Sequence, residues 1–93
     1  MDKSFIYCIS DNNGHCKFGY SNDPLKRLKQ LQTGNIHTLT LLHSIPVPKQ
    51  QVKILESKLH KEINYKKIKG EWFNIDNDQA INLLTWFEIH YIE

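Results

Sequence analysis

FIYCISDNNGHCKFGYSNDPLKRLKQLQTGN, which runs from Phe5 to Asn35, is the stretch of sequence that decides the fold. Residues 4–9 are rich in aromatic and β-branched side chains, which predicts a strand, and residues 16–20 are predicted to form a second short strand. Residues 11–14 (DNNG) lie between them and are typical of a turn. The sequence therefore predicts a β-hairpin at the start of the chain.

A helix is predicted directly after the hairpin. Asp23 can accept hydrogen bonds from free backbone N–H groups, and Pro24 suits the first helical position. Gly34 supplies the end of the helix. We expect one stripe of this helix to face the core and its polar residues to lie elsewhere on its surface: Leu25, Leu28 and Leu31 form the stripe, and Lys26, Arg27, Lys29 and Gln30 the polar set.

The remainder of the chain alternates strands and helices. Residues 37–45 predict a third strand ended by Pro46 and Pro48, and residues 50–65 predict a longer helix from their apolar spacing. Residues 66–70 are expected to form a basic loop, followed by an extended segment in GEWFNI, residues 70–75. Asp76 with Gln79 resembles a capping box that starts a last helix.

The predicted order is β-β-α-β-α-β-α, which indicates an α+β fold with a small, mainly antiparallel β-sheet flanked by helices. We expect a single domain over residues 1–93, since a chain of 93 residues buries one modest core. Neither a long apolar run nor a signal peptide is evident, so we expect an intracellular protein whose Cys8 and Cys16 are reduced and half-buried.

Charge alone does not identify a partner, because the formal net charge is only +2. The basic residues are clustered, however, and a local basic face suits a polyanion such as DNA. Each cluster taken alone is more simply a solvated surface. The candidates for contact with the nucleic-acid backbone are Lys26, Lys29, Lys58, His60, Lys66, Lys67 and Lys69, and Lys61 is a further helix lysine of the same kind.

Three cationic or phenolic side chains are predicted to meet near the hairpin. If the hairpin closes on an odd-numbered loop, either 11–13 or 10–14, Tyr7 pairs directly with Lys17 and both side chains point to one face. Arg27, in the first turns of the following helix, would lean over that face. Together they would suit a phosphate, although each residue alone is more simply structural.

A carboxylate and an imidazole are expected on one face of the second helix. Glu56 and His60 are four residues apart, and Glu56 interrupts the apolar stripe directly after Leu55. A carboxylate near the inner face of a helix is costly without a partner or a metal, and Mg²⁺ typically takes one or two carboxylates. We expect His60 to be structural or close to phosphate rather than a metal ligand.

These residues resemble the two-part signature of the GIY-YIG endonucleases. Ile6-Tyr7 stand for its first half and Lys17-Phe18-Gly19 for its second, followed by Arg27 in the helix. The segments ESKLH, residues 56–60, and GEWF, residues 70–73, are similar to a branch found in phages, large DNA viruses and bacteria. Gly19, Trp72 and Phe73 would be structural parts of these motifs, and Glu71 would cap or orient a neighbour.

The resemblance implies metal-dependent cleavage of DNA phosphodiester bonds with one Mg²⁺ or Mn²⁺. Tyr7 would be the general base or would position the attacking water, Arg27 would stabilise the transition state, and Glu56 would hold the ion. Lys17 stands where many members have a Tyr, and it would either lower the pKa of Tyr7 or bind phosphate.

Two alternatives use the same fold. One is a catalytically inactive module that binds nucleic acid, which the Lys17 substitution motivates. The other is a protein-interaction domain. We expect no room for a separate DNA-reading domain in these 93 residues, and therefore expect recognition of DNA structure, a protein partner that supplies specificity, or little selectivity.

Overall fold

Five antiparallel strands form one sheet in the part of the chain that this computed structural model describes, residues 3–92. Their spatial order is β3-β1-β2-β5-β4, so the two outermost strands are β3 and β4. The bounds are β1 (Lys3–Ser10), β2 (Cys16–Ser21), β3 (Thr40–Pro48), β4 (Lys67–Lys69) and β5 (Trp72–Phe73). The α+β class and the predicted order of elements are thereby confirmed, and β4 is an additional strand.

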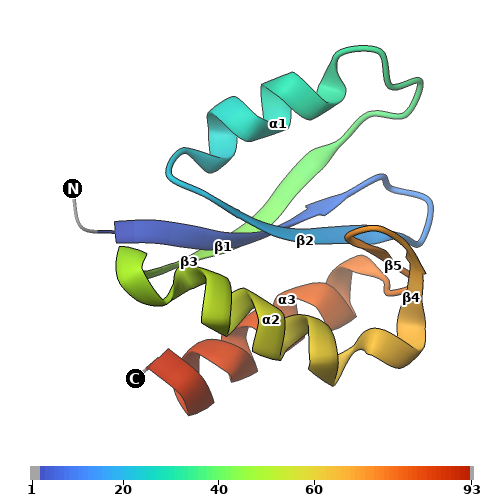
Figure 1. The fold of residues 1–93 in the computed structure, drawn as a ribbon. Coiled ribbons are helices and arrows are strands. Elements are labelled where there is room, and N and C mark those ends of the chain that lie inside the picture. The colour runs from blue at the N-terminus through green and yellow to red at the C-terminus, as the bar shows by residue number, and fades with distance from the viewer. Residues whose placement is uncertain (1–2, 93) are drawn as a thin grey trace.

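Helices cover both faces of the sheet. Helix α1 (Pro24–Gln32) lies over one face, and α2 (Val52–Glu62) and α3 (Asn77–Phe87) lie over the other (Figure 1). Short turns of 3₁₀ helix flank α2 at Lys49–Gln51 and Asn64–Lys66, and a π-helical turn, Glu88–Ile92, follows α3. Within residues 3–92, no helix combines the length and the apolar character needed to cross a bilayer.

The register of the hairpin differs from the predicted one. Tyr7 pairs with Gly19, and Lys17 pairs with Ile9, because the loop is Asp11–His15, which is centred one residue later than either predicted loop. The Asp11 carboxylate accepts hydrogen bonds from the backbone N–H groups of Asn13 and His15, which stabilises this loop. The expected direct pair of Tyr7 with Lys17 is therefore wrong, but residues 7, 9, 17 and 19 still share one face of the sheet.

Two segments predicted to be irregular are strands. Pro46 and Pro48 lie inside β3 rather than ending it, because β3 is an outer strand that pairs, within residues 3–92, with β1 alone. Residues 67–69, predicted as part of a basic loop, form β4 and pair with β5. Both errors arise from sheet edges, where proline and lysine are well tolerated.

Alternation along the strands divides the apolar residues into two layers. Ile6, Cys8 and Phe18 pack with α2 and α3 in the main core, whereas Tyr7 and Ile9 pack on the α1 side. Both cysteines are free thiols, as expected, but they are fully buried rather than half-buried. Successive residues of β1 and β2 therefore alternate between the two faces of the sheet. One face packs in the main core, and the other carries residues of the candidate site.

Helix α1 buries less of its leucine stripe than the sequence predicted. Leu28 and Leu31 are half-buried against the smaller layer, but Leu25 is exposed. The predicted cap at its start is confirmed, since the Asp23 carboxylate accepts from the Lys26 backbone N–H. The capping box of Asp76 and Gln79 at the start of α3 is also confirmed.

The position of α2 depends on its buried leucines, which yields a stability prediction. Leu59 is 0% exposed and Ile54, on the same helix, is 62% exposed. Leu59→Ala should lower the free energy of unfolding by about 2–5 kcal/mol, because it leaves a cavity in the core. Ile54→Ala should change it by less than about 0.5 kcal/mol. Urea unfolding followed by circular dichroism measures both, and equal losses would contradict this description of the core.

Candidate functional site at the edge of β2

The outer edge of β2 at Phe18 is where the candidate site is assembled. Strand β5 pairs with β2 only at Cys16 and Lys17. At the next residue, the Phe18 backbone N–H donates to the Glu71 backbone oxygen at 3.0 Å, and the Phe18 carbonyl lies 2.8 Å from His60 Nε2. One residue of β2 therefore binds both the turn before β5 and the face of α2.

Glu56, His60 and Glu71 form a cluster beside this edge. Each offers one ligand atom, and these atoms all lie within 4.8 Å of one another. Glu56 Oε2 is buried and has no hydrogen-bond partner among the described residues. Burial and the nearby Glu71 carboxylate raise the pKa of Glu56 to about 7. A buried carboxylate oxygen without a partner is the kind of atom that a cation stabilises.

Lys17 supplies a positive charge to this cluster. Its Nζ lies 3.1 Å from Glu71 Oε1 and 5.9 Å from the centre of the Trp72 ring. The ammonium group therefore partly offsets the two carboxylates, and it lowers the pKa of Glu56 against the larger effect of burial. The predicted site residue Lys17 is thus at the site, but its nearest partner is Glu71 rather than Tyr7.

Gly19 brings the Tyr7 hydroxyl to the same place. A Cβ atom added to Gly19 would lie 2.6 Å from Tyr7 Oη and 2.9 Å from Glu71 Oε1. Only a residue without a side chain leaves room for these two groups to approach each other across β2. Tyr7 and the Glu56–His60–Glu71 cluster are therefore on one side of the molecule, as the predicted site requires.

The electrostatic environment of Tyr7 differs from the expected one. Burial, followed by the Glu71 carboxylate, raises the pKa of Tyr7 to about 12, and the Arg27 guanidinium opposes this only in part. The expectation that neighbouring cations favour the phenolate is wrong for this arrangement, because burial and the Glu71 carboxylate outweigh the Arg27 guanidinium. At neutral pH the Tyr7 hydroxyl keeps its proton.

Arg27 approaches the site from α1. The charge of its guanidinium acts on Tyr7 and lowers the pKa of the phenol, although the larger effect of burial raises it overall. It also lines an open hollow of about 370 Å³ together with Tyr20, Asp23 and Lys26, between the end of β2 and the first turns of α1. Arg27 therefore presents a cation both toward Tyr7 and toward this open hollow.

The T5orf172 domain family matches residues 4–88, which include every residue of the site described above. The chain belongs to the T5orf172 domain family. This is a phage nuclease-associated family, so the chain is a nuclease-like or DNA-binding domain. No curated protein and no solved structure matches it.

Several lysines predicted to contact nucleic acid lie away from the site of this T5orf172 domain. Lys58 Nζ is 5.7 Å from the centre of the Tyr91 ring, after the end of α3, and Lys66 lies over Tyr65. On an α-helix, Lys58 and Lys61 are two and five residues from Glu56 and therefore point to other faces of α2. Lys67 and Lys69 are on the outer strand β4, and the turn that follows Lys69 carries the site residue Glu71.

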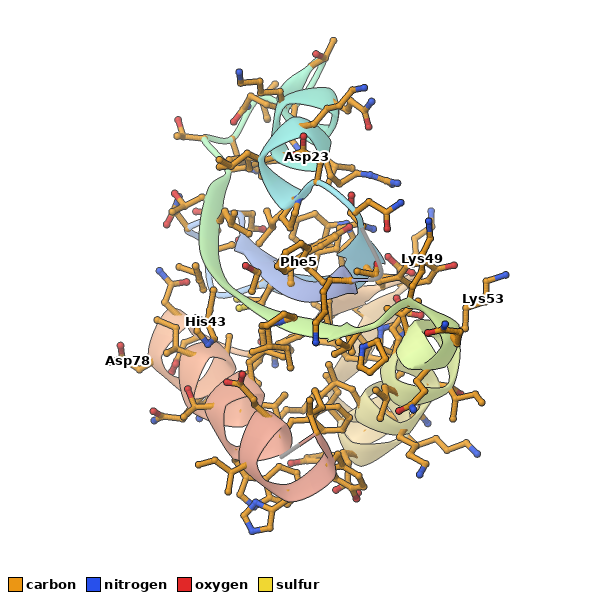
Figure 2. The ribbon with its side chains drawn as sticks, turned by 90° about the vertical axis from the view of Figure 1, so that its left-hand side faces the viewer. Phe5, Asp23, His43, Lys49, Lys53 and Asp78 are labelled. Atoms are coloured by element: carbon orange, nitrogen blue, oxygen red, sulfur yellow. The ribbon has the colours of Figure 1, made fainter. Side chains whose placement is uncertain are left out.

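Two other lysines, which were not predicted, align along the helix with Glu56 and His60 of the site. Lys49, Lys53, Glu56 and His60 are spaced by four, three and four residues, which places them along one helical stripe. Figure 2 shows Lys49 and Lys53 extending into solvent on the side of the molecule opposite Asp78 and His43. Because this spacing is visible in the sequence, it could have predicted that both lysines align with Glu56.

Glu71 is the other site residue that the sequence did not reveal. It was expected to cap or orient a neighbour, since a carboxylate between a glycine and two aromatic residues has no distinctive spacing. Its role depends on the turn between β4 and β5, which places its backbone oxygen on Phe18 and its side chain on Lys17. Such a long-range approach follows from the strand pairing and not from the local pattern.

Gly19 gives a direct test of the packing at the site. Gly19→Ala should destabilise the T5orf172 domain by about 1–3 kcal/mol, because the new methyl group overlaps the Tyr7 hydroxyl. The double variant Gly19→Ala/Tyr7→Phe should recover part of that loss. Thermal unfolding of the three proteins measures both effects, and a Gly19→Ala protein as stable as wild type would contradict the close approach.

Glu56 predicts a characteristic pH dependence of stability when divalent cations are removed with a chelator. Its pKa rises from 4.5 in the unfolded chain to about 7 in the folded one, so the folded state holds the proton more tightly. This contribution to stability is complete below pH 4.5 and is lost as pH rises through 7. The stability of wild type relative to Glu56→Gln should therefore fall between these values. A difference that is constant with pH would contradict the raised pKa.

Proposed function

We propose that this T5orf172 domain is a metal-dependent endonuclease that hydrolyses phosphodiester bonds in DNA. The observation that supports it most is the convergence of Tyr7, Lys17 and Glu56 at one edge of β2, with Arg27 approaching from α1. A phenol, two cations and a carboxylate are the groups that hydrolysis of a charged phosphodiester needs. The family's association with nucleases agrees with this chemistry.

Glu56 would hold one divalent ion, Mg²⁺ or Mn²⁺. The fit rests on its buried Oε2, which has no hydrogen-bond partner among residues 3–92 and is stabilised by a cation. When bound, such an ion offsets negative charge on a phosphate oxygen and activates water. The side chain of Glu56 extends from the middle of α2, a rigid element fixed by Leu55 and Leu59 in the core.

Tyr7 would orient the attacking water as a neutral phenol. Its pKa of about 12 makes it a poor proton acceptor at neutral pH, but an O–H group is a good hydrogen-bond donor. The buried strand position of Tyr7 holds its hydroxyl in place over Gly19. Of the two roles that the sequence left open, positioning is therefore the one we propose.

Arg27 and Lys17 would bind the phosphate. A guanidinium donates two parallel hydrogen bonds to phosphate oxygens and keeps its charge at any pH of interest. Lys17 is paired with Glu71 at 3.1 Å, so its ammonium group is already fixed beside the cluster before DNA arrives. Both cations would stabilise the additional negative charge that develops in the transition state.

The DNA backbone would run from the hollow beside Arg27 along the stripe of α2. Lys26 lines that hollow, and Lys49 and Lys53 continue the positive charge on the other side of Glu56. Contacts of this kind recognise phosphates and not base sequence, and they weaken as salt increases. The reaction would then be steered by DNA geometry more than by sequence.

Cleavage of plasmid and branched DNA tests the proposed function. Wild type should cut when Mg²⁺ or Mn²⁺ is added and not in a chelator. Tyr7→Phe and Arg27→Ala should each reduce the rate by about 10²-fold or more, and Glu56→Ala should abolish metal-dependent cleavage. Glu62→Ala is the matched control, since Glu62 is an exposed carboxylate at the end of the same helix.

The result that would overturn the proposal is DNA binding without cleavage in either metal. That outcome would favour the catalytically inactive binding module, for which the pairing of Lys17 with Glu71 and the raised pKa of Tyr7 are specific observations. Absence of DNA binding at low salt would favour a protein-interaction domain instead.

The path of the DNA has its own test. Lys49→Ala and Lys53→Ala should each weaken DNA binding and reduce the slope of log K against log salt by about 1. Lys58→Ala and Lys61→Ala are matched controls on the other faces of α2 and should have smaller effects. Fluorescence anisotropy at several salt concentrations measures these slopes, and equal effects for both pairs would contradict the proposed path.

A further inference from the structure

We propose that Glu56, His60 and Glu71 bind one ion together, and that this set of ligands prefers a first-row transition cation such as Mn²⁺ to Mg²⁺. The inference deepens the proposed function and rests on it for the use of the ion, but not for its binding. It adds two ligands to the single carboxylate that the sequence indicated.

The distances suit a single shared ion. The three ligand atoms lie within 4.8 Å of one another, and they come from two elements that meet at the edge of β2. Ligand oxygens at about 2.1 Å from one ion lie at most about 4.2 Å apart, so a small inward movement of the side chains completes the set. Glu56 Oε2, buried and without a hydrogen-bond partner among the described residues, can supply one ligand.

His60 is prepared to act as a ligand by its hydrogen bond to β2. The Phe18 carbonyl can only accept, so His60 Nε2, 2.8 Å away, carries the proton. In the neutral ring this leaves the lone pair of Nδ1 free for a metal. A backbone carbonyl on the other ring nitrogen is a common way of fixing the tautomer and orientation of a histidine ligand. The edge-to-face contact with Phe73, at 5.1 Å between ring centres, holds the ring further.

Glu71 is held at the site by its own backbone. Its carbonyl oxygen accepts from the Phe18 N–H at 3.0 Å, so the two prospective ligands are bound to the two polar groups of a single β2 residue. Its carboxylate is paired with Lys17 at 3.1 Å. Lys17 therefore acts as the cation that stabilises Glu71 before an ion binds, and it competes with the ion for the Glu71 carboxylate.

The preference for a transition cation follows from the nitrogen ligand. Mg²⁺ binds oxygen ligands and keeps most of its waters, whereas imidazole suits the first-row transition cations. Two carboxylates with one imidazole accept Mn²⁺ readily. Removal of the imidazole should therefore reduce the affinity for Mn²⁺ more than the affinity for Mg²⁺.

Electron paramagnetic resonance of free Mn²⁺ measures this binding without DNA and without catalysis, and Mg²⁺ competition gives the selectivity. Glu71→Gln and His60→Gln should each weaken Mn²⁺ binding by about tenfold or more. His60→Gln keeps an N–H donor for the Phe18 carbonyl, and Glu62→Gln is the control variant for loss of a carboxylate. Circular dichroism and thermal unfolding verify that each variant is folded.

Two further measurements, of metal preference and of Mn²⁺ affinity, distinguish ligands from residues that merely support the structure. His60→Gln should reduce the preference for Mn²⁺ over Mg²⁺ by about tenfold. Lys17→Met should tighten Mn²⁺ binding by about threefold or more, because it removes the competing cation from Glu71. A Glu71 that serves only to pair with Lys17 would act on the ion through its charge alone, so Glu71→Gln would weaken Mn²⁺ binding by well under tenfold.

The outcomes separate the inference from the proposed function. If Glu56→Gln abolishes Mn²⁺ binding while Glu71→Gln and His60→Gln bind as wild type does, the inference is overturned and the proposed function stands. If Mn²⁺ binds with the expected pattern but DNA is never cut, the inference stands and the proposed function fails. A wild-type protein that binds no Mn²⁺ overturns the three-ligand site.

Discussion

The two hydrogen bonds at the backbone of Phe18 are the constraint on which the candidate site depends. Strand β5 pairs with β2 only at Cys16 and Lys17, and beyond them the exposed edge of β2 needs other partners for its N–H and C=O groups. Glu71 and His60 provide them. Because the Phe18 side chain is buried against Phe73, this anchor is fixed in the core, and the chemistry-bearing groups of α2 and the β4–β5 turn are positioned by it.

The site gathers charge at a cost to stability. Two carboxylates lie close together, one of them partly buried with its pKa raised to about 7, and a single ammonium group offsets them. Natural proteins keep such an arrangement where function requires it, since an apolar substitute would be at least as stable. A divalent cation is the partner that relieves the repulsion, and the same ion would be the source of the proposed reactivity. Stability and function are therefore expected to oppose each other at Glu56.

Local patterns predicted much of the fold and part of the site. The i, i+4 spacing of Glu56 and His60, the caps at Asp23 and Asp76, and the α+β order were all readable because each depends on neighbours in sequence. The hairpin register was not, because it depends on the Asp11 carboxylate closing a five-residue loop with Gly14 at φ +88°. Glu71 was missed for a similar reason, since only the pairing of distant strands brings it to Lys17.

The central claim is that the edge of β2 beside Tyr7 holds one divalent ion. Diffraction from a crystal soaked in Mn²⁺, recorded where manganese scatters anomalously, tests this claim most directly. The account predicts one strong anomalous peak at about 2.2 Å from a Glu56 carboxylate oxygen, on the side of β2 where Tyr7 and Glu71 approach Gly19. A crystal with manganese bound at other carboxylates and none at Glu56 would contradict it.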